Sequence, residues 1–270
     1  MKVAIQGEPG SFHDEAAHRF FSDINVELVS CQTFHQVFDA VENDSAKAGL
    51  VSVENSLYGS IHDVYDELAT LKASIIGEIT LAIEQQLIAH LKTKLNDITE
   101  VYSHPAALNQ CRDWLETNLP NAELIEHHDT AGAVNYIKSN RLMRAAAIAS
   151  EAAAHLYDMS ILRRSIQDEA DNFTRFLVIT HLPEAVKRAN KASLILVTSH
   201  EPGALYEALG VFKRYNCNLT KLESRPIRGK PFNYQFIVDV LTDQNMLIST
   251  ITELERQGCR VTMLGHYEAS

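Results

Sequence analysis

The stretch Lys2-Val-Ala-Ile-Gln-Gly-Glu-Pro-Gly-Ser11 decides the fold of the first part of the chain. Its first five residues predict a short buried strand, and its glycines and proline predict a tight turn. Ser11 belongs to the residue types that cap helix N-termini, and residues 13–21 have the apolar spacing of a helix. A strand that leads through a turn into a helix is the repeating unit of parallel sheets flanked by helices.

This unit recurs along the first 180 residues. Further strands are predicted at 26–29, 50–53, 101–103, 122–126, 145–149 and 173–180, and further helices at 33–41, 60–71, 105–116, 130–137 and 151–157. The long apolar stretch 75–90 is interpreted as one or two strands that leave the first sheet. Because the chain returns late, we expect two lobes, one of residues 1–77 with 160–180 and one of residues 78–159. The predicted fold class is α/β, with parallel-rich sheets in two lobes and a cleft between them.

The pattern changes near residue 191. The net charge of −11 is carried by residues 1–191, whereas residues 192–270 carry equal numbers of acidic and basic side chains. The elements expected in this tail are strands at 192–198, 219–227, 232–241 and 260–267, helices at 203–215 and 245–257, and a hairpin turn at 228–230. Their order, βαββαβ, is that of the ferredoxin-like fold. Residues 181–191 are the predicted linker.

Composition excludes several classes of protein. A net charge of −11 argues against a basic surface that binds nucleic acid. No apolar run reaches the roughly 20 residues of a membrane helix, and no signal peptide follows Met1. The four cysteines have neither metal-ligand nor disulfide spacing, so we interpret them as reduced thiols, mostly in the core. We expect a cytoplasmic protein that neither enters a membrane nor holds a metal.

Two segments have the side chains of a binding site for a small carboxylate that contains a ring. They are Val53-Glu-Asn-Ser-Leu-Tyr-Gly-Ser60 and Asp171-Asn-Phe-Thr-Arg-Phe176. The guanidinium of Arg175 can bind a carboxylate through two hydrogen bonds, short hydroxyl and amide side chains can bind other oxygens, and phenylalanines exclude water. Two alternatives stay open: a structural ion pair of Arg175 with a nearby aspartate, and a core position for Phe176.

Five polar segments follow predicted strands and lead into predicted helices. They are residues 7–11, 55–60, 103–105, 129–130 and Ser150. Helix N-termini bind anions through their free N–H groups, and in an open parallel sheet they gather at the carboxyl ends of the strands. We expect two or three of these five segments to line the cleft.

Eight motifs occur in order along the chain. They are Gly7-Glu-Pro-Gly-Ser-Phe12, Val53-Glu-Asn-Ser56 with Gly59-Ser60, Ser103-His-Pro-Ala-Ala-Leu108, Asp129-Thr-Ala-Gly-Ala133, Ala146-Ala-Ile-Ala-Ser150, Asn172-Phe-Thr-Arg-Phe176, Gly203-Ala-Leu205 and Asn218-Leu-Thr-Lys-Leu-Glu-Ser-Arg-Pro226. Together they make essentially all of the chain resemble the prephenate dehydratases, in the form that carries a regulatory ACT domain. His13, Ser52 and Ala106 depart from the residues usual in that family. The monofunctional form is expected, because no helical chorismate mutase segment precedes Met1.

The resemblance implies a catalytic region at 1–180 with a two-lobed fold like that of periplasmic binding proteins. It implies conversion of prephenate to phenylpyruvate, with loss of carbon dioxide and water and without a cofactor or metal. The implied catalytic residues are Thr174 as hydrogen-bond donor to the departing hydroxyl, Arg175 as carboxylate clamp, and Asn55, Ser56 and Ser60 as neutral donors. The implied substrate-binding residues are Ser11, Ser103, Thr130, Asn172 and Phe176. Asn172 could instead cap the turn before its strand, and roles for His104 and Glu54 stay open.

The resemblance also implies an ACT domain at 192–270 that binds L-phenylalanine as a feedback effector. The implied effector-binding residues are Gly203, Ala204, Leu205, Asn218, Leu219, Thr220, Glu223 and Ser224. Because the effector site of this family lies between two ACT domains, a homodimer or homotetramer is expected. The alternative is that Gly203 only starts a helix and the sheet joins subunits.

Two other functions are compatible with these residues. An arogenate dehydratase performs the same chemistry on a substrate with an amino group in place of the keto oxygen. A two-lobed amino-acid-binding protein without catalysis would use the same fold, because a fold does not fix function.

Overall fold

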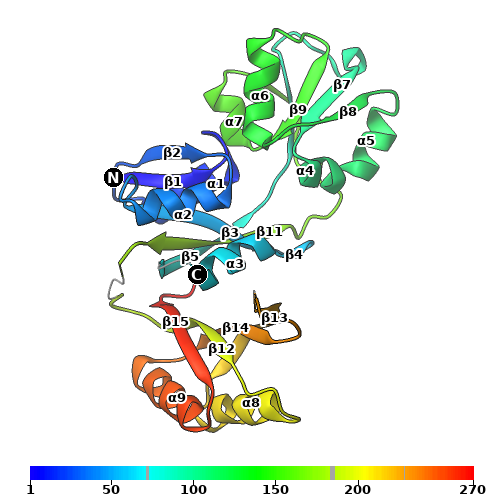
Figure 1. The fold of residues 1–270 in the computed structure, drawn as a ribbon. Helices are drawn as coiled ribbons and strands as arrows, with labels where there is room; N and C mark the ends of the chain where they lie inside the picture. Colours follow the sequence, from blue (N-terminus) through cyan, green and yellow to red (C-terminus); the bar gives the residue numbers. More distant parts are fainter. Residues whose placement is uncertain (71–72, 183–185, 228) are drawn as a thin grey trace. The chain divides into compact units, whose positions relative to one another are not determined.

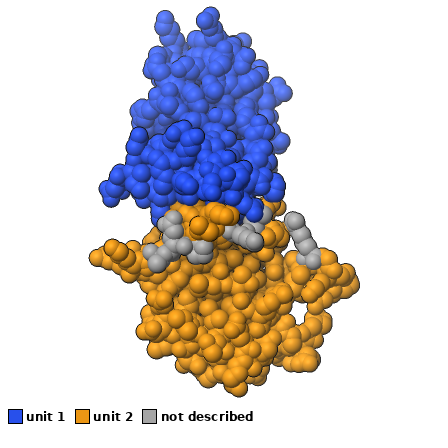
Figure 2. All heavy atoms as spheres, turned by 60° about the vertical axis from the view of Figure 1, so that its left-hand side comes forward, with its two compact units in different colours: residues 1–61, 80–176 blue, residues 62–79, 177–270 orange. Residues whose placement is uncertain are grey.

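The computed structural model describes residues 1–70, 73–182, 186–227 and 229–270 (Figure 1). The expected hairpin turn at 228–230 and the expected linker at 181–191 therefore lie partly outside the described residues. The chain divides into two compact units, residues 1–61 with 80–176 and residues 62–79 with 177–270, which Figure 2 distinguishes by colour. The second unit thus includes residues 62–77, which were expected in the first lobe. The domain boundaries predicted from the sequence stay a prediction.

The first sheet is built around parallel strands. It contains β1 (Lys2–Gln6), β2 (Glu27–Cys31), β3 (Ala48–Asn55), β4 (Gly59–Ser60), β5 (Ser74–Ala82) and β11 (Phe173–Thr180). The order is β2-β1-β3-β11-β5, with β1 parallel to both β2 and β3 and with β4 antiparallel to the end of β3. The late strand β11 thus joins the sheet begun by β1, as expected from the return of the chain.

Two helices pack against this sheet, α1 (Phe12–Phe20) and α2 (Phe34–Glu42). Each begins after a hydroxyl side chain in extended conformation: Ser11 accepts a hydrogen bond from the Asp14 amide and Thr33 accepts one from the Gln36 amide, both at 3.3 Å. These caps satisfy N–H groups that have no partner inside the helix. The turn predicted from residues 2–11 therefore forms as expected.

The second sheet lies in the same unit. It contains β6 (Gln86–Ala89), β7 (Glu100–Ser103), β8 (Glu123–Glu126), β9 (Ala145–Ala149) and β10 (Ser160–Arg163) in the order β10-β6-β9-β7-β8. β7 is parallel to β8 and β9, whereas β6 is antiparallel to β9 and β10. All five residues of β9 are buried, and four of them are alanines, which lets helices approach the sheet closely. The mixed, parallel-rich sheets confirm the predicted α/β class.

The helices of this sheet are α4 (Pro105–Gln110), α5 (Arg112–Asn118), α6 (Thr130–Ser139) and α7 (Glu151–Leu156), and a short 3₁₀ helix, η1 (Leu95–Asp97), precedes β7. Three expectations were wrong in detail. The helix expected at 105–116 is interrupted at Cys111, strand β10 was not expected, and the helix expected at 60–71 begins at His62 because Ser60 is held in β4.

The C-terminal sheet has the predicted βαββαβ order. Its elements are β12 (Lys191–Val197), α8 (Ala204–Arg214), β13 (Asn218–Pro226), β14 (Tyr234–Leu241), α9 (Gln244–Arg256) and β15 (Arg260–Tyr267). The strands are antiparallel in the order β13-β14-β12-β15. Both helices cover one face, where Leu194, Leu196, Phe212, Val238 and Leu254 form the core (Figure 1). Gly258 follows α9 with φ +85°, the left-handed conformation in which glycine commonly ends a helix.

The other face of this sheet includes buried polar side chains beside the apolar Ile195 and Ile237. Lys191 Nζ lies 2.9 Å from both carboxylate oxygens of Glu78 on β5, and both side chains are buried. Ser193 Oγ lies 2.6 Å from Asp239 Oδ1 and 2.6 Å from the Tyr267 hydroxyl. Buried charges need partners of this kind, because burial without them is costly. This face therefore packs against residues 62–79, which contain α3 (His62–Thr70) and part of β5. The polar contact between Lys191 and Glu78 joins the two parts.

None of the described helices is both long enough and apolar enough to span a membrane. All four cysteines are free, and Cys31, Cys111 and Cys217 are buried, which confirms their interpretation as core thiols.

The close approach of β15 to β5 yields the first prediction. A Cβ atom on Gly265 would overlap the carbonyl oxygen of Ile75, so Gly265→Ala should destabilise the protein by about 1–3 kcal/mol. Gly210 in α8 is the matched control, because its Cβ would meet only Arg214 Nη1 at 3.7 Å and alanine favours helices. Thermal unfolding followed by circular dichroism should show a lower Tm for Gly265→Ala and an equal or higher one for Gly210→Ala. Equal Tm values for the two variants would contradict this account.

Candidate functional site

A buried amide joins the two segments that the sequence analysis selected. Asn55 Nδ2, at the end of β3, donates to Asn172 Oδ1 at 2.7 Å, to the Phe173 carbonyl at 3.1 Å and to Thr174 Oγ1 at 3.0 Å. Asn55, Asn172 and Thr174 are all buried. The structure thus places three of the predicted site residues in direct contact.

The hydrogen bonds of its side-chain oxygen determine how the Asn55 amide is oriented. Its Oδ1 accepts hydrogen bonds from the backbone N–H groups of Leu57 and Tyr58, at 3.0 and 3.1 Å. Because a backbone N–H can only donate, the atom that it meets must be the amide oxygen. The NH₂ group therefore faces Thr174, and the threonine oxygen acts as an acceptor toward Asn55. The hydroxyl hydrogen of Thr174 must point elsewhere.

Ser56 joins the same two segments through the backbone. Its amide donates to the Phe173 carbonyl at 2.8 Å, and its hydroxyl donates to the Asp171 carbonyl at 2.9 Å and accepts from the Phe173 amide at 2.9 Å. Both functions of the hydroxyl are therefore used within the protein. Ser60 lies in β4, where it pairs with Glu54, and Asn55 pairs with Gly59. These contacts hold the turn at 56–58 in place.

Arg175 and Thr174 leave β11 on opposite faces, because successive side chains of a strand alternate. Thr174 and Phe176 are buried on one face, whereas Arg175 is partly buried on the other. Arg175 Nη1 lies 3.9 Å from Glu54 Oε2, a long ion pair. Glu54 is thus placed beside Arg175 and away from the amide of Asn55.

Phe176 packs against His13 of α1. The two rings meet edge to face with centroids 5.0 Å apart, and Phe34 lies 5.8 Å from the same histidine. Phe176 is only 1% exposed, which agrees with a core position. Burial lowers the pKa of His13 from 6.5 to about 4, so the imidazole is neutral at pH 7. The departure from the family at this position has therefore placed a titratable ring in an apolar contact beside β11.

Three of the five predicted helix starts gather around the turn at residues 7–11. Ser150 Oγ, which caps α7, donates to the Gly10 carbonyl at 2.5 Å, and the Tyr157 hydroxyl donates to the Pro9 carbonyl at 3.2 Å. A Cβ atom on Gly7 would lie 3.8 Å from Cβ of Asp129, the residue that caps α6. The N-termini of α1, α6 and α7 therefore converge, with Ser11 and Thr130 at two of them.

Two other residues selected from the sequence have structural partners. Ser103 is fully buried and donates to the Ile148 carbonyl at 2.6 Å, which connects β7 to β9. His104 caps α4, where its Nδ1 accepts from the Ala106 amide at 3.2 Å. Burial lowers the pKa of His104, which keeps the ring neutral at pH 7 and makes it a poor proton donor. This favours the helix-start interpretation of His104.

A cluster of potential metal ligands, not expected from the sequence, lies at the start of α6. Side-chain ligand atoms of His127, His128 and Asp129 lie within 4.8 Å of one another. The contacts of Asp129 explain the cluster without an ion. Its Oδ1 accepts from the Gly132 amide at 2.6 Å, and its Oδ2 lies 2.8 Å from His128 Nε2. The carboxylate is already used to cap the helix and to pair with a histidine.

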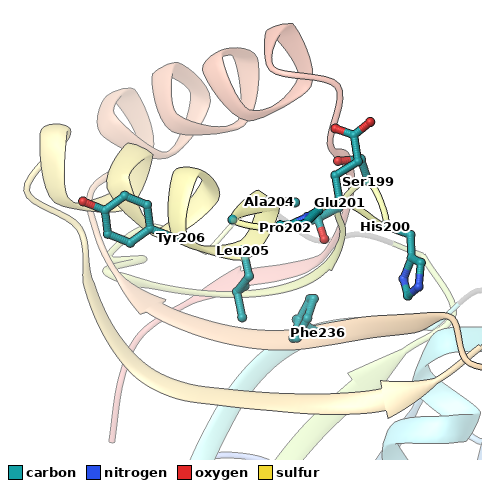
Figure 3. Close-up of a pocket in the computed structure, with 10 residues that line it drawn as sticks. Ser199, His200, Glu201, Pro202, Ala204, Leu205, Tyr206 and Phe236 are labelled. Atoms are coloured by element: carbon teal, nitrogen blue, oxygen red, sulfur yellow. The ribbon is translucent and has the colours of Figure 1, made fainter.

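The C-terminal sheet carries a separate pocket of about 590 Å³ at the start of α8 (Figure 3). Gly203, Ala204 and Leu205, three of the predicted effector-binding residues, line it. The other lining residues are Thr198, Ser199, His200, Glu201, Pro202, Tyr206 and Phe236. Figure 3 shows Leu205 extending from the helix toward the strand that bears Phe236. Gly203 has φ +87°, a left-handed conformation that disfavours residues with a side chain.

The remaining predicted effector residues lie on β13 and do not line this pocket. The side chains of Asn218, Thr220 and Ser224 alternate with those of Leu219 and Glu223, which are partly buried. Leu219 packs in the core under the helices, and Glu223 Oε1 lies 2.8 Å from His62 Nε2. Within one chain, one effector motif therefore lies at the start of α8 and lines the pocket, whereas the other lies on β13 outside it.

Comparison with known proteins connects this geometry to a family. The profile of the family described as prephenate dehydratase matches residues 3–184, which include the Asn55–Thr174 contact and the converging helix starts. The chain belongs to the prephenate dehydratase family. It is therefore a hydro-lyase of aromatic amino-acid biosynthesis.

Two relatives show the range of substrates in this family. The chain is 38% identical over 269 residues to a bifunctional chorismate mutase/prephenate dehydratase of Aquifex aeolicus, covering 99% of the chain and 73% of the relative. It is 40% identical over 232 residues to arogenate dehydratase 2 of Petunia hybrida, covering 84% of the chain and 57% of the relative. The family assignment thus includes dehydratases named for prephenate and for arogenate.

Solved structures share the whole fold. A prephenate dehydratase of Arthrobacter aurescens in complex with L-Phe is 27% identical, with a TM-score of 0.88 over 99% of this chain and 90% of that one. A protein described as a novel type of quorum quenching acylase is 30% identical, with a TM-score of 0.89 over 100% of this chain and 98% of that one. Proteins described with different activities therefore share this fold over nearly the whole chain.

The burial of His13 predicts how stability depends on pH. Because the folded-state pKa of His13 lies below the unfolded value of 6.5, the unfolded chain binds a proton that the native protein excludes. Its contribution to stability is complete above pH 6.5 and is lost as pH falls toward 4, by about 3 kcal/mol in total. Urea unfolding of His13→Gln should depend less on pH in this window than unfolding of the unmodified protein.

His18→Gln, on the exposed side of the same helix, is the matched control for this measurement. It should leave the pH dependence between 6.5 and 4 in place. The same slope in the unmodified protein and in His13→Gln would show that His13 is not the group responsible.

Proposed function

We propose that this chain is a prephenate dehydratase that is inhibited by L-phenylalanine. In the reaction the ring carboxylate leaves as carbon dioxide, and its bonding electrons enter the ring as the opposite C–O bond breaks. The departing hydroxide takes a proton and leaves as water, and phenylpyruvate remains. No electrons leave the substrate, so the balance needs no redox partner. The protein has to donate a hydrogen bond to the departing oxygen and hold two carboxylates in place.

The contact between Asn55 and Thr174 is the observation that carries this proposal. The amide NH₂ group donates to the Thr174 oxygen at 3.0 Å, so the hydroxyl hydrogen points away from Asn55 and can donate to another group. A threonine hydroxyl is a very weak acid, so we assign it a hydrogen bond that strengthens as negative charge develops on the departing oxygen. Asn172 supports this arrangement by accepting from the same NH₂ group at 2.7 Å.

Anion binding is assigned to helix N-termini and to Arg175. The substrate is a dianion, whereas the catalytic region carries an excess of negative charge, so attraction must come from local groups. The converging starts of α1 and α6 provide N–H groups beside Ser11 and Thr130. Arg175 lies on the face of β11 opposite Thr174. There it would bind a substrate carboxylate in place of its long contact with Glu54.

Arogenate is the second candidate substrate. It differs from prephenate by an amino group in place of the keto oxygen, far from the bonds that break. Relatives of similar identity are named for each substrate, so one protein preparation should be assayed with both. The Thr174 chemistry is the same in either case.

The pocket at Gly203 is proposed as the effector site. A solved relative is described as a complex with L-Phe, which supports L-phenylalanine as the ligand. The motif on β13 lies outside this pocket, so a second copy of the chain would have to supply it, and we propose a homodimer or homotetramer. Exposed aromatic rings of Tyr206 and Phe232 suit such an interface.

Removal of the donor tests the catalytic assignment. Thr174→Val keeps the shape of the side chain but cannot donate a hydrogen bond, and it should lower kcat by roughly 10²–10³. Phenylpyruvate formed from prephenate is measured by its absorbance in base, and phenylalanine formed from arogenate by chromatography. Thr180→Val, at the far end of the same strand, is the control and should retain most of the activity. An unmodified protein inactive on both substrates, or an active Thr174→Val, would refute the proposal.

Substitution of Gly203 tests the effector site. The φ of +87° at this position is unfavourable for valine, so Gly203→Val should distort the pocket and weaken L-phenylalanine binding by more than about tenfold. Binding is measured by titration calorimetry, with Gly210→Ala in the same helix as the control. Unchanged affinity in Gly203→Val would place the effector elsewhere.

A further inference from the structure

A bulge in strand β13 determines which of its side chains face the helices and which face the opposite side of the sheet. The register with β14 shifts between Leu219, which pairs with Val240, and Lys221, which pairs with Asp239. Leu219 and Val240 belong to the core under α8 and α9. After the shift, Lys221 and the alternate residues that follow it share the side of the sheet on which Asp239 lies, opposite the helices.

This second face of β13 holds α3. Arg225 donates to Asp66 through Nε at 3.2 Å and through Nη2 at 2.9 Å to each carboxylate oxygen. His62 Nε2 lies 2.8 Å from Glu223 Oε1, and Lys221 Nζ lies 5.1 Å from the centroid of the Tyr65 ring. Residues 62, 65 and 66 lie on one side of the helix, and residues 221, 223 and 225 on one side of the strand.

The Arg225–Asp66 pair is stronger than an ordinary surface ion pair. The two side chains are only 17% and 24% exposed, so water screens them weakly. The guanidinium contacts both carboxylate oxygens, a geometry that fixes orientation as well as distance. Loss of either partner would leave a partly buried charge without its counterion. This pair therefore fixes α3 against β13.

Helix α3 continues directly from the strand that supports the catalytic turn. Gly59 and Ser60 pair with Asn55 and Glu54, and the Ile61 amide donates to the Val53 carbonyl at 2.9 Å. His62, the first residue of α3, follows immediately. A displacement of α3 must therefore be absorbed within the residues that position Asn55.

The opposite face of β13 adjoins the pocket at Gly203. Ser224 pairs with Phe236 of β14, and Phe236 lines that pocket. Glu223 and Arg225, which flank Ser224 in the chain, are the residues that contact His62 and Asp66. Successive residues of β13 thus point alternately toward the side of the Gly203 pocket and toward α3.

We propose that Arg225 and Asp66 are positioning residues of the dehydratase site, and that β13 transmits occupancy of the Gly203 pocket through α3 to the strand Gly59–Ser60. The identity of the effector and of the reaction rests on the proposed function above. The anchoring of β4 by the Arg225–Asp66 pair does not, and it is measured without substrate or effector.

Hydrogen–deuterium exchange of the full protein tests the anchor. Asp66→Asn keeps the shape of the side chain and removes its charge, whereas Arg225→Lys keeps the charge and loses the double contact. Exchange of the amides at residues 59–61 should accelerate by roughly tenfold or more in Asp66→Asn and by less in Arg225→Lys. The control is Glu253→Gln, which removes contacts with Arg256 and Arg214 on α9 and α8 and should leave this exchange unchanged.

Unchanged exchange at 59–61 in two variants with native circular dichroism overturns the anchor. A variant that fails to fold is replaced by the other, since each removes the same contact from a different side. These results stand even if the unmodified protein turns over neither prephenate nor arogenate, an outcome that would refute the proposed function alone.

Inhibition curves test the transmission. In Asp66→Asn the L-phenylalanine concentration for half-inhibition should rise by roughly tenfold or more, while calorimetry still detects saturable L-phenylalanine binding. KM should rise more than kcat falls if the variant loosens the substrate contacts of the turn and spares Thr174. An inhibition curve identical to that of the unmodified protein would overturn transmission through this pair.

Discussion

The buried side-chain amide of Asn55 holds together two segments of the catalytic region that are far apart in the chain. It contacts residues that are 117 and 119 positions away in the chain, and its two ends bind acceptors of residues 172–174 and the amides of residues 57 and 58. Each hydrogen bond adds only about 1 kcal/mol net, but an unsatisfied buried amide costs more, so the arrangement is all-or-none in practice. The direction in which Thr174 donates is limited by this constraint, because the amide donates to the threonine oxygen and the hydroxyl hydrogen points away from Asn55.

Local pattern in the sequence predicted much of the fold. The strand, turn and helix begun by residues 2–11, the fully buried strand at 145–149 and the βαββαβ tail follow from periodicity and capping residues alone. The details that failed depend on contacts distant in sequence. Ser60 was expected in a helix, but pairing with Glu54 holds it in a strand, and β10 exists because β6 offers it an edge.

The residue types of the candidate site could be predicted from the sequence, but the directions in which their side chains point could not. Asn55, Thr174 and Asn172 were selected and do meet, because the end of β3 lies beside the start of β11 in the same sheet. The opposite directions of Thr174 and Arg175, and the use of the Ser103 hydroxyl to hold two strands together, required the structure. A protein described as an acylase shares this fold, so the fold alone does not determine the reaction, which depends on the orientation of particular groups.

The bulge in β13 restricts how this strand can change during evolution. Thr220 has no paired residue on β14 at the shift, so its loss would leave a regular ladder in which Leu219 still pairs with Val240 and Lys221 with Asp239. An additional residue beyond position 221 would instead turn the side chains that follow it to the other face, so that Glu223 or Arg225 would point toward the apolar layer beneath α8 and α9. Homologous chains should therefore tolerate the loss of one residue at position 220 but not the gain of one between positions 221 and 226, so that selection on the length of this strand acts in one direction.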